Sequence, residues 1–98
     1  MNIPEDPVIQ ELIGEFVDTW ILDIENDFKR LVETKNSEDL YRLAHTLKGS
    51  CFQFGLDDIA HLGIELMDKA KAKEWDIALT YEQPLREKFI EVRNFLNK

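Results

Sequence analysis

A long series of apolar residues, spaced three and four positions apart, constrains the fold of this chain more than any other feature. The series spans residues 8–32, about seven turns of an α-helix. This spacing places every member on one face of a helix, whereas a half-buried strand would need strict alternation. Its members are Val8, Ile9, Leu12, Ile13, Phe16, Val17, Trp20, Ile21, Ile24, Phe28, Leu31 and Val32. The sequence therefore predicts a long amphipathic helix whose apolar face must be covered by other elements.

Two residues bear on where this first helix begins and whether it is continuous. Pro7 suits its first turn, where the missing N–H is not needed. Gly14 lies inside the pattern, where glycine costs about 1 kcal/mol relative to alanine. Two interpretations stay open. Gly14 is either a tolerated weak position in one long helix, or it separates a possible short extra N-terminal helix from the main one.

Further helical patterns follow, separated by short breaks. Ser37 precedes two acidic residues and is a predicted N-cap for a helix over residues 38–53. Gly55 is placed to end that helix. The third helix is expected to begin at Asp57 or Asp58.

The last pattern extends from Trp75 to Leu96 and contains Pro84, which must kink or break it. No stretch shows sustained strand alternation, and the short breaks favour antiparallel neighbours. We therefore expect an all-α fold, an antiparallel four-helix bundle that forms a single domain over residues 1–98. A chain of this length can bury about 65% of its unfolded surface, enough for one modest core.

Charge and cysteine content exclude several classes of partner and location. Twelve Lys and Arg residues against twenty Asp and Glu residues give a formal net charge of −8. Nucleic acid and anionic membranes both require a basic surface, so neither is expected as a partner, and the charge favours a monomer.

Residues 1–7 lack the pattern of a secretion signal, and no apolar run approaches the roughly 20 residues of a membrane span. The single cysteine, Cys51, fits a reducing compartment, so we expect a cytoplasmic protein.

The second predicted helix has an unusual polar face. Its apolar residues cluster on one side of a helical wheel: Leu40, Leu43, Ala44, Leu47, Cys51 and Phe54. His45 points to the opposite side, toward solvent. Residues three, four or seven positions away share its face, with Arg42 at the edge: Tyr41, Lys48, Gly49 and Phe52.

These residue types suit the capture of a phosphoryl group. Neutral imidazole, with an unperturbed pKa of about 6.5, offers a nucleophilic ring nitrogen. Lys48, one turn from His45, could stabilise charge on a phosphoryl group during in-line transfer. Gly49 lowers helix propensity, a cost that is explained if another protein must approach closely. Phe52 would supply the apolar part of that docking surface.

A resemblance to the histidine-phosphotransfer (HPt) domain family is carried by three segments: Ala44-His45-Thr46-Leu47-Lys48-Gly49-Ser50, Phe54-Gly55-Leu56 and Ile59-Ala60-His61-Leu62. The resemblance extends over nearly the whole chain. It implies that His45 is phosphorylated on its outer ring nitrogen by a receiver-domain aspartyl phosphate. It also implies that Lys48 neighbours the phosphate and that position 49 must stay small.

Some positions differ from the family's usual pattern or vary within it. Cys51 and Phe52 stand where relatives commonly have small residues, which predicts a bulkier docking surface. Lys71 stands where some relatives carry a basic residue near the phosphohistidine, and Met67 where some have a glutamine that supports the imidazole. The residues assigned to partner docking are Tyr41, Arg42, Gly49, Phe52 and Lys71.

The function implied by this resemblance is that of a phosphocarrier in a multistep His-Asp phosphorelay. His45 would take the phosphoryl group from one receiver domain and return it to another. The implied partners are response-regulator receiver domains and a hybrid sensor kinase. The partner would supply Mg²⁺, so no cofactor is expected for this chain. It has no Gly-rich phosphate loop, and it is not expected to be an enzyme that phosphorylates itself.

Two other functions are compatible with parts of the sequence. A non-phosphorylated adaptor could bind a receiver or a sensor kinase through Tyr41 and Phe52, but it would not need His45. A helical metalloenzyme could use His61 with Asp58 and Glu65. Di-metal bundles, however, require carboxylates and two Glu-x-x-His motifs converging from several helices. No metal site is therefore expected.

Overall fold

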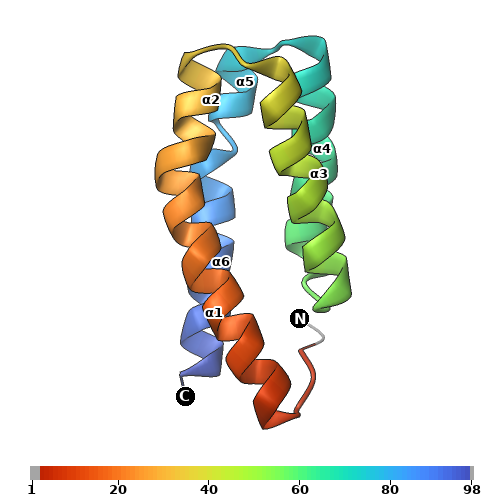
Figure 1. The fold of residues 1–98 in the computed structure, drawn as a ribbon, viewed down its shortest axis with the longest axis vertical. Helices are drawn as coiled ribbons and strands as arrows, with labels where there is room; N and C mark the ends of the chain where they lie inside the picture. Colours follow the sequence, from red (N-terminus) through yellow and green to blue (C-terminus); the bar gives the residue numbers. More distant parts are fainter. Residues whose placement is uncertain (1–2, 98) are drawn as a thin grey trace.

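The computed structural model describes residues 3–97, and within that range the chain forms helices and no strand. The elements in chain order are α1 (Pro7–Asp23), the π-helical segment η1 (Ile24–Phe28), α2 (Lys29–Glu33), α3 (Ser37–Gln53), α4 (Asp57–Ala72), α5 (Trp75–Leu79) and α6 (Glu82–Leu96). Figure 1 shows α1 paired with α6 on one side of the bundle and α3 paired with α4 on the other. The predicted all-α helical bundle is confirmed.

The first helix runs without interruption through α1, η1 and α2. Asp6 caps it, because its carboxylate accepts a hydrogen bond of 2.8 Å from the backbone N–H of Val8, and Pro7 occupies the first turn. The wide π-helical turns fall at Ile24–Phe28, and both end residues of this segment are fully buried. The apolar spacing predicted the helix but not this local widening.

Gly14 does not interrupt the first helix. It lies inside α1, so the possible short extra N-terminal helix was a wrong alternative for the residues that the structure describes. Ile13 and Val17, on either side of Gly14, are fully buried in the core, and this packing outweighs the low helix propensity of glycine. A Cβ at position 14 would lie at an ordinary distance of 3.9 Å from Leu96.

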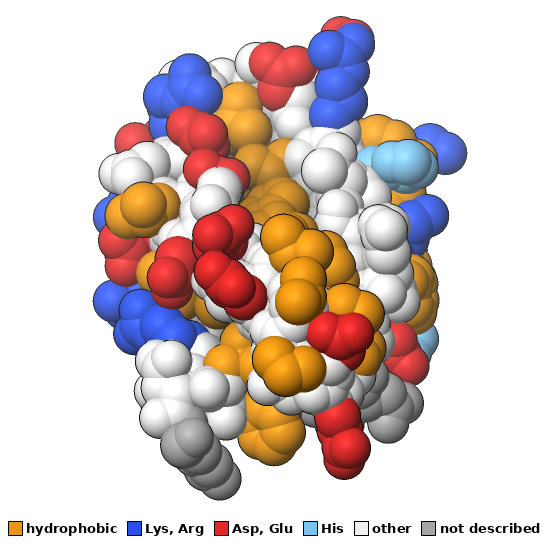
Figure 2. Space-filling view, turned by 60° about the horizontal axis from the view of Figure 1, so that its bottom comes forward, with side chains coloured by type: hydrophobic (Ala, Val, Ile, Leu, Met, Phe, Trp, Pro, Cys, Tyr) orange, Lys and Arg blue, Asp and Glu red, His pale blue; other side chains and the backbone are white. Residues whose placement is uncertain are grey.

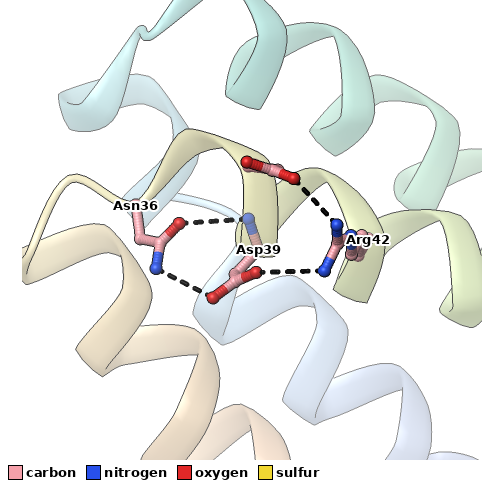
Figure 3. Close-up of polar contacts among 4 residues, drawn as sticks. Asn36, Asp39 and Arg42 are labelled. Carbon is pink, nitrogen blue, oxygen red and sulfur yellow. Dashed lines mark hydrogen bonds and ion pairs between the residues drawn. The ribbon is translucent and has the colours of Figure 1, made fainter.

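The cap of α3 differs from the predicted one. Asn36, rather than Ser37, is the N-cap, and its side-chain oxygen accepts a hydrogen bond of 3.1 Å from the backbone N–H of Asp39. Its amide nitrogen donates to the Asp39 carboxylate at 2.9 Å. Arg42 extends this network through ion pairs to Glu38 at 2.8 Å and to Asp39 at 3.7 Å (Figure 3). Asn36 is the N-cap in place of Ser37 because both polar atoms of its side-chain amide form hydrogen bonds with Asp39.

A tight turn joins α3 to α4, as predicted. Gly55 has a φ of 77°, and its N–H donates to the carbonyl of Phe52, while the N–H of Leu56 donates to the carbonyl of Cys51 at 2.8 Å. This pair of bonds is the Schellman motif, which requires a left-handed residue at the position of Gly55. At the other end of the hairpin, the Ser37 hydroxyl donates to the carbonyl of Ala70 at 2.6 Å. The two helices are therefore tied together at both ends.

The last helical pattern is divided, as Pro84 predicted. α5 ends at Leu79 and α6 begins at Glu82, which places Pro84 in the first turn of α6, where its missing N–H costs no hydrogen bond. The α6 helix is held against the first helix by ion pairs from Arg86 to Glu25 at 2.9 Å and from Arg93 to Asp18 at 4.0 Å.

Aromatic rings fill the core between these helices. Trp20 is buried and stacks on Phe89 with ring centroids 6.2 Å apart, as expected of a core anchor. Phe16 contacts Phe54 at 5.0 Å, which connects α1 with the end of α3. Trp75, the first residue of α5, is half-buried against the same core.

We expect replacement of Lys73 by glycine to stabilise the fold. Lys73 follows α4 with a φ of 58°, a left-handed conformation that costs an L-residue about 1 kcal/mol relative to glycine. The free energy of unfolding, measured with urea, should rise by roughly 0.5–1 kcal/mol in Lys73→Gly. The matched control is Lys29→Gly, inside a right-handed helix, which should lose about 1 kcal/mol. Equal losses in both variants would contradict the assignment of strain to Lys73.

Candidate functional site

The α3 helix presents His45 to solvent. Leu40, Ala44, Leu47 and Cys51 are fully buried on its opposite side, as the helical wheel predicted. On the exposed side, Tyr41 and Phe52 retain 37% and 43% of their accessible surface. Arg42 and Gly49 are exposed, and Lys48 is half-buried. The structure therefore brings the candidate residues of α3 onto one face.

The imidazole of His45 has few contacts with the rest of the protein. Its nearest aromatic neighbour is Tyr41, whose ring centroid lies 6.4 Å away at an interplanar angle of 25°. Within residues 3–97, no group forms a hydrogen bond or an ion pair with the imidazole of His45, whose backbone groups belong to the α3 helix. Met67 of α4, which the sequence analysis considered as a support for the imidazole, is half-buried against the core and offers only a thioether. Both ring nitrogens are thus left available.

Arg42 and Lys48 lie three residues before and three residues after His45 on α3, and the two cations differ in their partners. The Lys48 ammonium forms no ion pair among the described residues, whereas Arg42 is engaged by Glu38 and Asp39. An unpaired ammonium is free to approach an anion brought to His45, and such contacts are stronger where water is partly excluded. The arrangement can therefore place positive charge beside a phosphoryl group on the imidazole.

Lys71 reaches the same end of the face from α4. A groove between α3 and α4 is lined by Ser37, Glu38, Tyr41, Arg42 and Lys71. Two cations and one carboxylate thus surround Tyr41, one turn before His45. The expectation that Lys71 lies near the site rested only on the resemblance. In the structure, Lys71 lines the same groove as Tyr41 and Arg42.

A close approach between α3 and α4 lies behind the candidate site. A Cβ atom built on Gly63 would meet the backbone carbonyl oxygen of Ala44 at 3.2 Å and the backbone nitrogen of Lys48 at 3.3 Å. These backbone atoms flank His45 in α3. Gly63 therefore sets the distance at which α4 supports the segment that carries His45. This contact joins residues of two different helices, so helical spacing along either one does not reveal it.

Gly49 has a different environment from Gly63. A Cβ built at position 49 would find no atom within 4 Å, so the fold itself leaves that space empty. Packing within this chain therefore does not account for glycine in the middle of α3.

Alanine substitutions should have opposite effects at these two glycines. In Gly49→Ala, the higher helix propensity of alanine should raise the free energy of unfolding by about 1 kcal/mol. In Gly63→Ala, overpacking against two backbone atoms should exceed that gain and lower the free energy of unfolding by about 1 kcal/mol. Urea denaturation followed by circular dichroism measures both values. Stabilisation by both substitutions would contradict the close-packing role of Gly63.

His61 lies beside the apolar end of the face. Its ring meets that of Phe52 edge-on, with centroids 5.6 Å apart and an interplanar angle of 88°. In the sequence, His61 was part of one of the segments that carry the resemblance and a candidate metal ligand, and neither interpretation predicted this contact. No group of three or more metal-ligating side chains converges in the part of the chain that the structure describes. The spacing of the Phe52 and His61 helix positions alone could not reveal the pair, because they belong to different helices.

Cys51 belongs to the core and not to the site. It is fully buried, and burial raises the pKa of its thiol to about 12. The thiolate that would act as a nucleophile is therefore suppressed at neutral pH. The predicted structural role of this residue agrees with its surroundings.

A comparison with protein families matches the Hpt domain over residues 11–95, nearly the whole chain. The chain belongs to the Hpt domain family. Hpt domains act as phosphocarriers in phosphorelays through histidine phosphotransfer, and they interact with receiver domains of two-component systems. Searches of curated proteins and of solved structures found no match. Among the described residues, no helix has the length and apolar character needed to cross a membrane.

Proposed function

We propose that this Hpt domain carries a phosphoryl group on His45, which it accepts from the aspartyl phosphate of one receiver domain and passes to another. The supporting observation is that the imidazole of His45 is exposed and forms no hydrogen bond, with the unpaired Lys48 one turn later on the same helix. No other exposed face in residues 3–97 combines a histidine with a cation three positions later and an empty space at a glycine.

In the accepting step, the lone pair of the outer ring nitrogen, Nε2, attacks phosphorus. The new N–P bond forms as the P–O bond of the acyl phosphate breaks, and the aspartate of the receiver leaves as a carboxylate. The imidazole keeps its proton on Nδ1. Return of the group to a second receiver reverses these bond changes, so neither direction requires a nucleotide.

The other residues of the face would act on charge and on docking. Lys48 would stabilise the negative oxygens of the phosphoryl group during transfer, and the receiver would bring Mg²⁺ with it. Gly49 leaves room for the receiver to approach His45, while Phe52 and Tyr41 offer apolar contact area. Arg42 and Lys71 at the groove would attract an acidic partner surface.

The wider setting of this function is part of the proposal. A hybrid sensor kinase and a response regulator would supply the two receiver domains. The chain would act as a monomer and a single domain in the cytoplasm, since its net charge of −8 disfavours self-association and its only cysteine is buried.

Replacement of His45 tests the phosphoacceptor directly. His45→Gln should abolish transfer of labelled phosphate from a phosphorylated receiver domain, because glutamine has no nucleophilic nitrogen. The label on the unchanged protein should be acid-labile and base-stable, as expected of phosphohistidine. His61→Gln is the matched control, and it should still accept the label.

Two outcomes would contradict the proposal that His45 carries the phosphoryl group. Label that persists in His45→Gln would show that another residue is phosphorylated. Tight binding of a receiver without any transfer, over a broad panel of receivers, would favour the non-phosphorylated adaptor.

Replacement of Lys48 separates charge stabilisation from docking. Lys48→Ala should slow phosphoryl transfer by about 10- to 100-fold, less than the loss expected for a preorganised donor, because no partner fixes the Lys48 ammonium in place. The dissociation constant for the unphosphorylated receiver should change by less than about threefold, since exposed charges contribute little to affinity. Rapid-quench kinetics and calorimetry measure the two quantities, with Lys29→Ala as a remote control. Equal losses in rate and in affinity would contradict the role in transfer.

A further inference from the structure

His45 needs a fixed ring plane if its outer nitrogen is to be aligned with phosphorus. In-line transfer demands that the attacking lone pair point at the phosphorus atom, and a freely turning ring meets this requirement only part of the time. No hydrogen bond or ion pair within residues 3–97 restrains the imidazole. Whatever orients the ring in this chain must therefore act by packing.

Tyr41 is the side chain that packs on this ring. It lies one turn before His45 on α3, at the spacing where helical side chains meet. Helical side chains lean toward the N-terminal end, which brings the imidazole over the turn that contains Tyr41. The ring centroids are 6.4 Å apart and the planes differ by 25°, an offset and nearly parallel arrangement.

We propose that Tyr41 is the positioning residue for His45: its ring face limits rotation of the imidazole and so sets the direction of Nε2. The biological meaning of this role rests on the proposed phosphotransfer, but the orienting effect does not require a partner protein. A phosphorylated imidazole is poorer in electrons than a neutral one, so contact with the electron-rich phenol ring should also favour the phosphorylated state.

The groove geometry supports this assignment. Tyr41 is 37% exposed and lines the groove with Lys71 of α4, so part of its ring is covered by protein. A ring that is covered on one side can act as a support, whereas a fully exposed ring would move together with the imidazole. Tyr41 can therefore restrain the imidazole through ring contact alone.

A small phosphoryl donor separates orientation from docking. Phosphoramidate can transfer its phosphoryl group without a protein partner: the Nε2 lone pair attacks phosphorus, the P–N bond of phosphoramidate breaks, and ammonia leaves. The rate of His45 labelling by phosphoramidate is compared in the unchanged protein, Tyr41→Phe and Tyr41→Leu. Circular dichroism establishes that each variant is folded.

Tyr41→Leu should lower the labelling rate by about two- to tenfold, the range that corresponds to the loss of one aromatic contact. Tyr41→Phe should keep the rate, because it retains the ring face. The control Phe95→Leu removes an exposed ring of α6 and should leave the rate unchanged. Nitrogen NMR of His45 provides a second readout: Tyr41→Leu should alter the ratio of the two imidazole tautomers and sharpen the ring signals, whereas Tyr41→Phe should not.

Three results would overturn the proposal. The first is an unchanged phosphoramidate rate and an unchanged His45 spectrum in Tyr41→Leu, even if transfer from the receiver falls, since Tyr41 would then act only in docking. The second is an equal loss in Tyr41→Phe, which would assign the effect to the hydroxyl. The third is failure of phosphoramidate to label the unchanged protein. Labelling by phosphoramidate without transfer from any receiver would instead overturn the proposed relay function and leave the orienting role of Tyr41 intact.

Discussion

The close contact between α3 and α4 is the constraint on which the candidate site depends. Because Gly63 has no side chain, the backbone of α4 comes within contact distance of Ala44 and Lys48, the residues on either side of His45. The Schellman turn at Gly55 and the bond from Ser37 to Ala70 hold the two ends of this hairpin. A rigid support of this kind matters for phosphoryl transfer, since an error of about 1 Å in the position of the attacking atom can cost a large part of the rate.

The chemistry of the site depends on polar side chains that have no partner within the fold and on an unfilled space at Gly49. His45 and Lys48 have no protein partner for their polar atoms in the described residues, and the space over Gly49 is empty. In the isolated fold, Gly49 lowers the helix propensity of α3, Phe52 leaves an aromatic ring exposed and Lys48 leaves a cation unpaired. These features cost stability within this chain, and the proposed docking of a receiver domain would give each of them a contact.

Much of the fold could be predicted from the pattern of apolar residues. The spacing of three and four from Val8 to Val32 is compatible only with a helix. Gly55 ends one later helix because it adopts a left-handed conformation, and Pro84 cannot lie in a helix interior because it lacks an N–H group. The cap of α3 was misassigned, because Asn36 and Ser37 are both good caps and only the side-chain contacts with Asp39 distinguish them. The π-helical turns at Ile24–Phe28 have no signal in composition, since they depend on how the first helix packs on the core.

The sequence by itself determined the helices, the solvent-facing position of His45 and the residues that share its face, because the helical repeat relates positions three, four and seven apart. Only the tertiary structure decided what other helices bring to that face. It placed Lys71 beside Tyr41, His61 against Phe52, and Gly63 behind the segment that carries His45. These contacts join residues of different helices, and their distances follow from how closely two helices pack, which no local periodicity encodes.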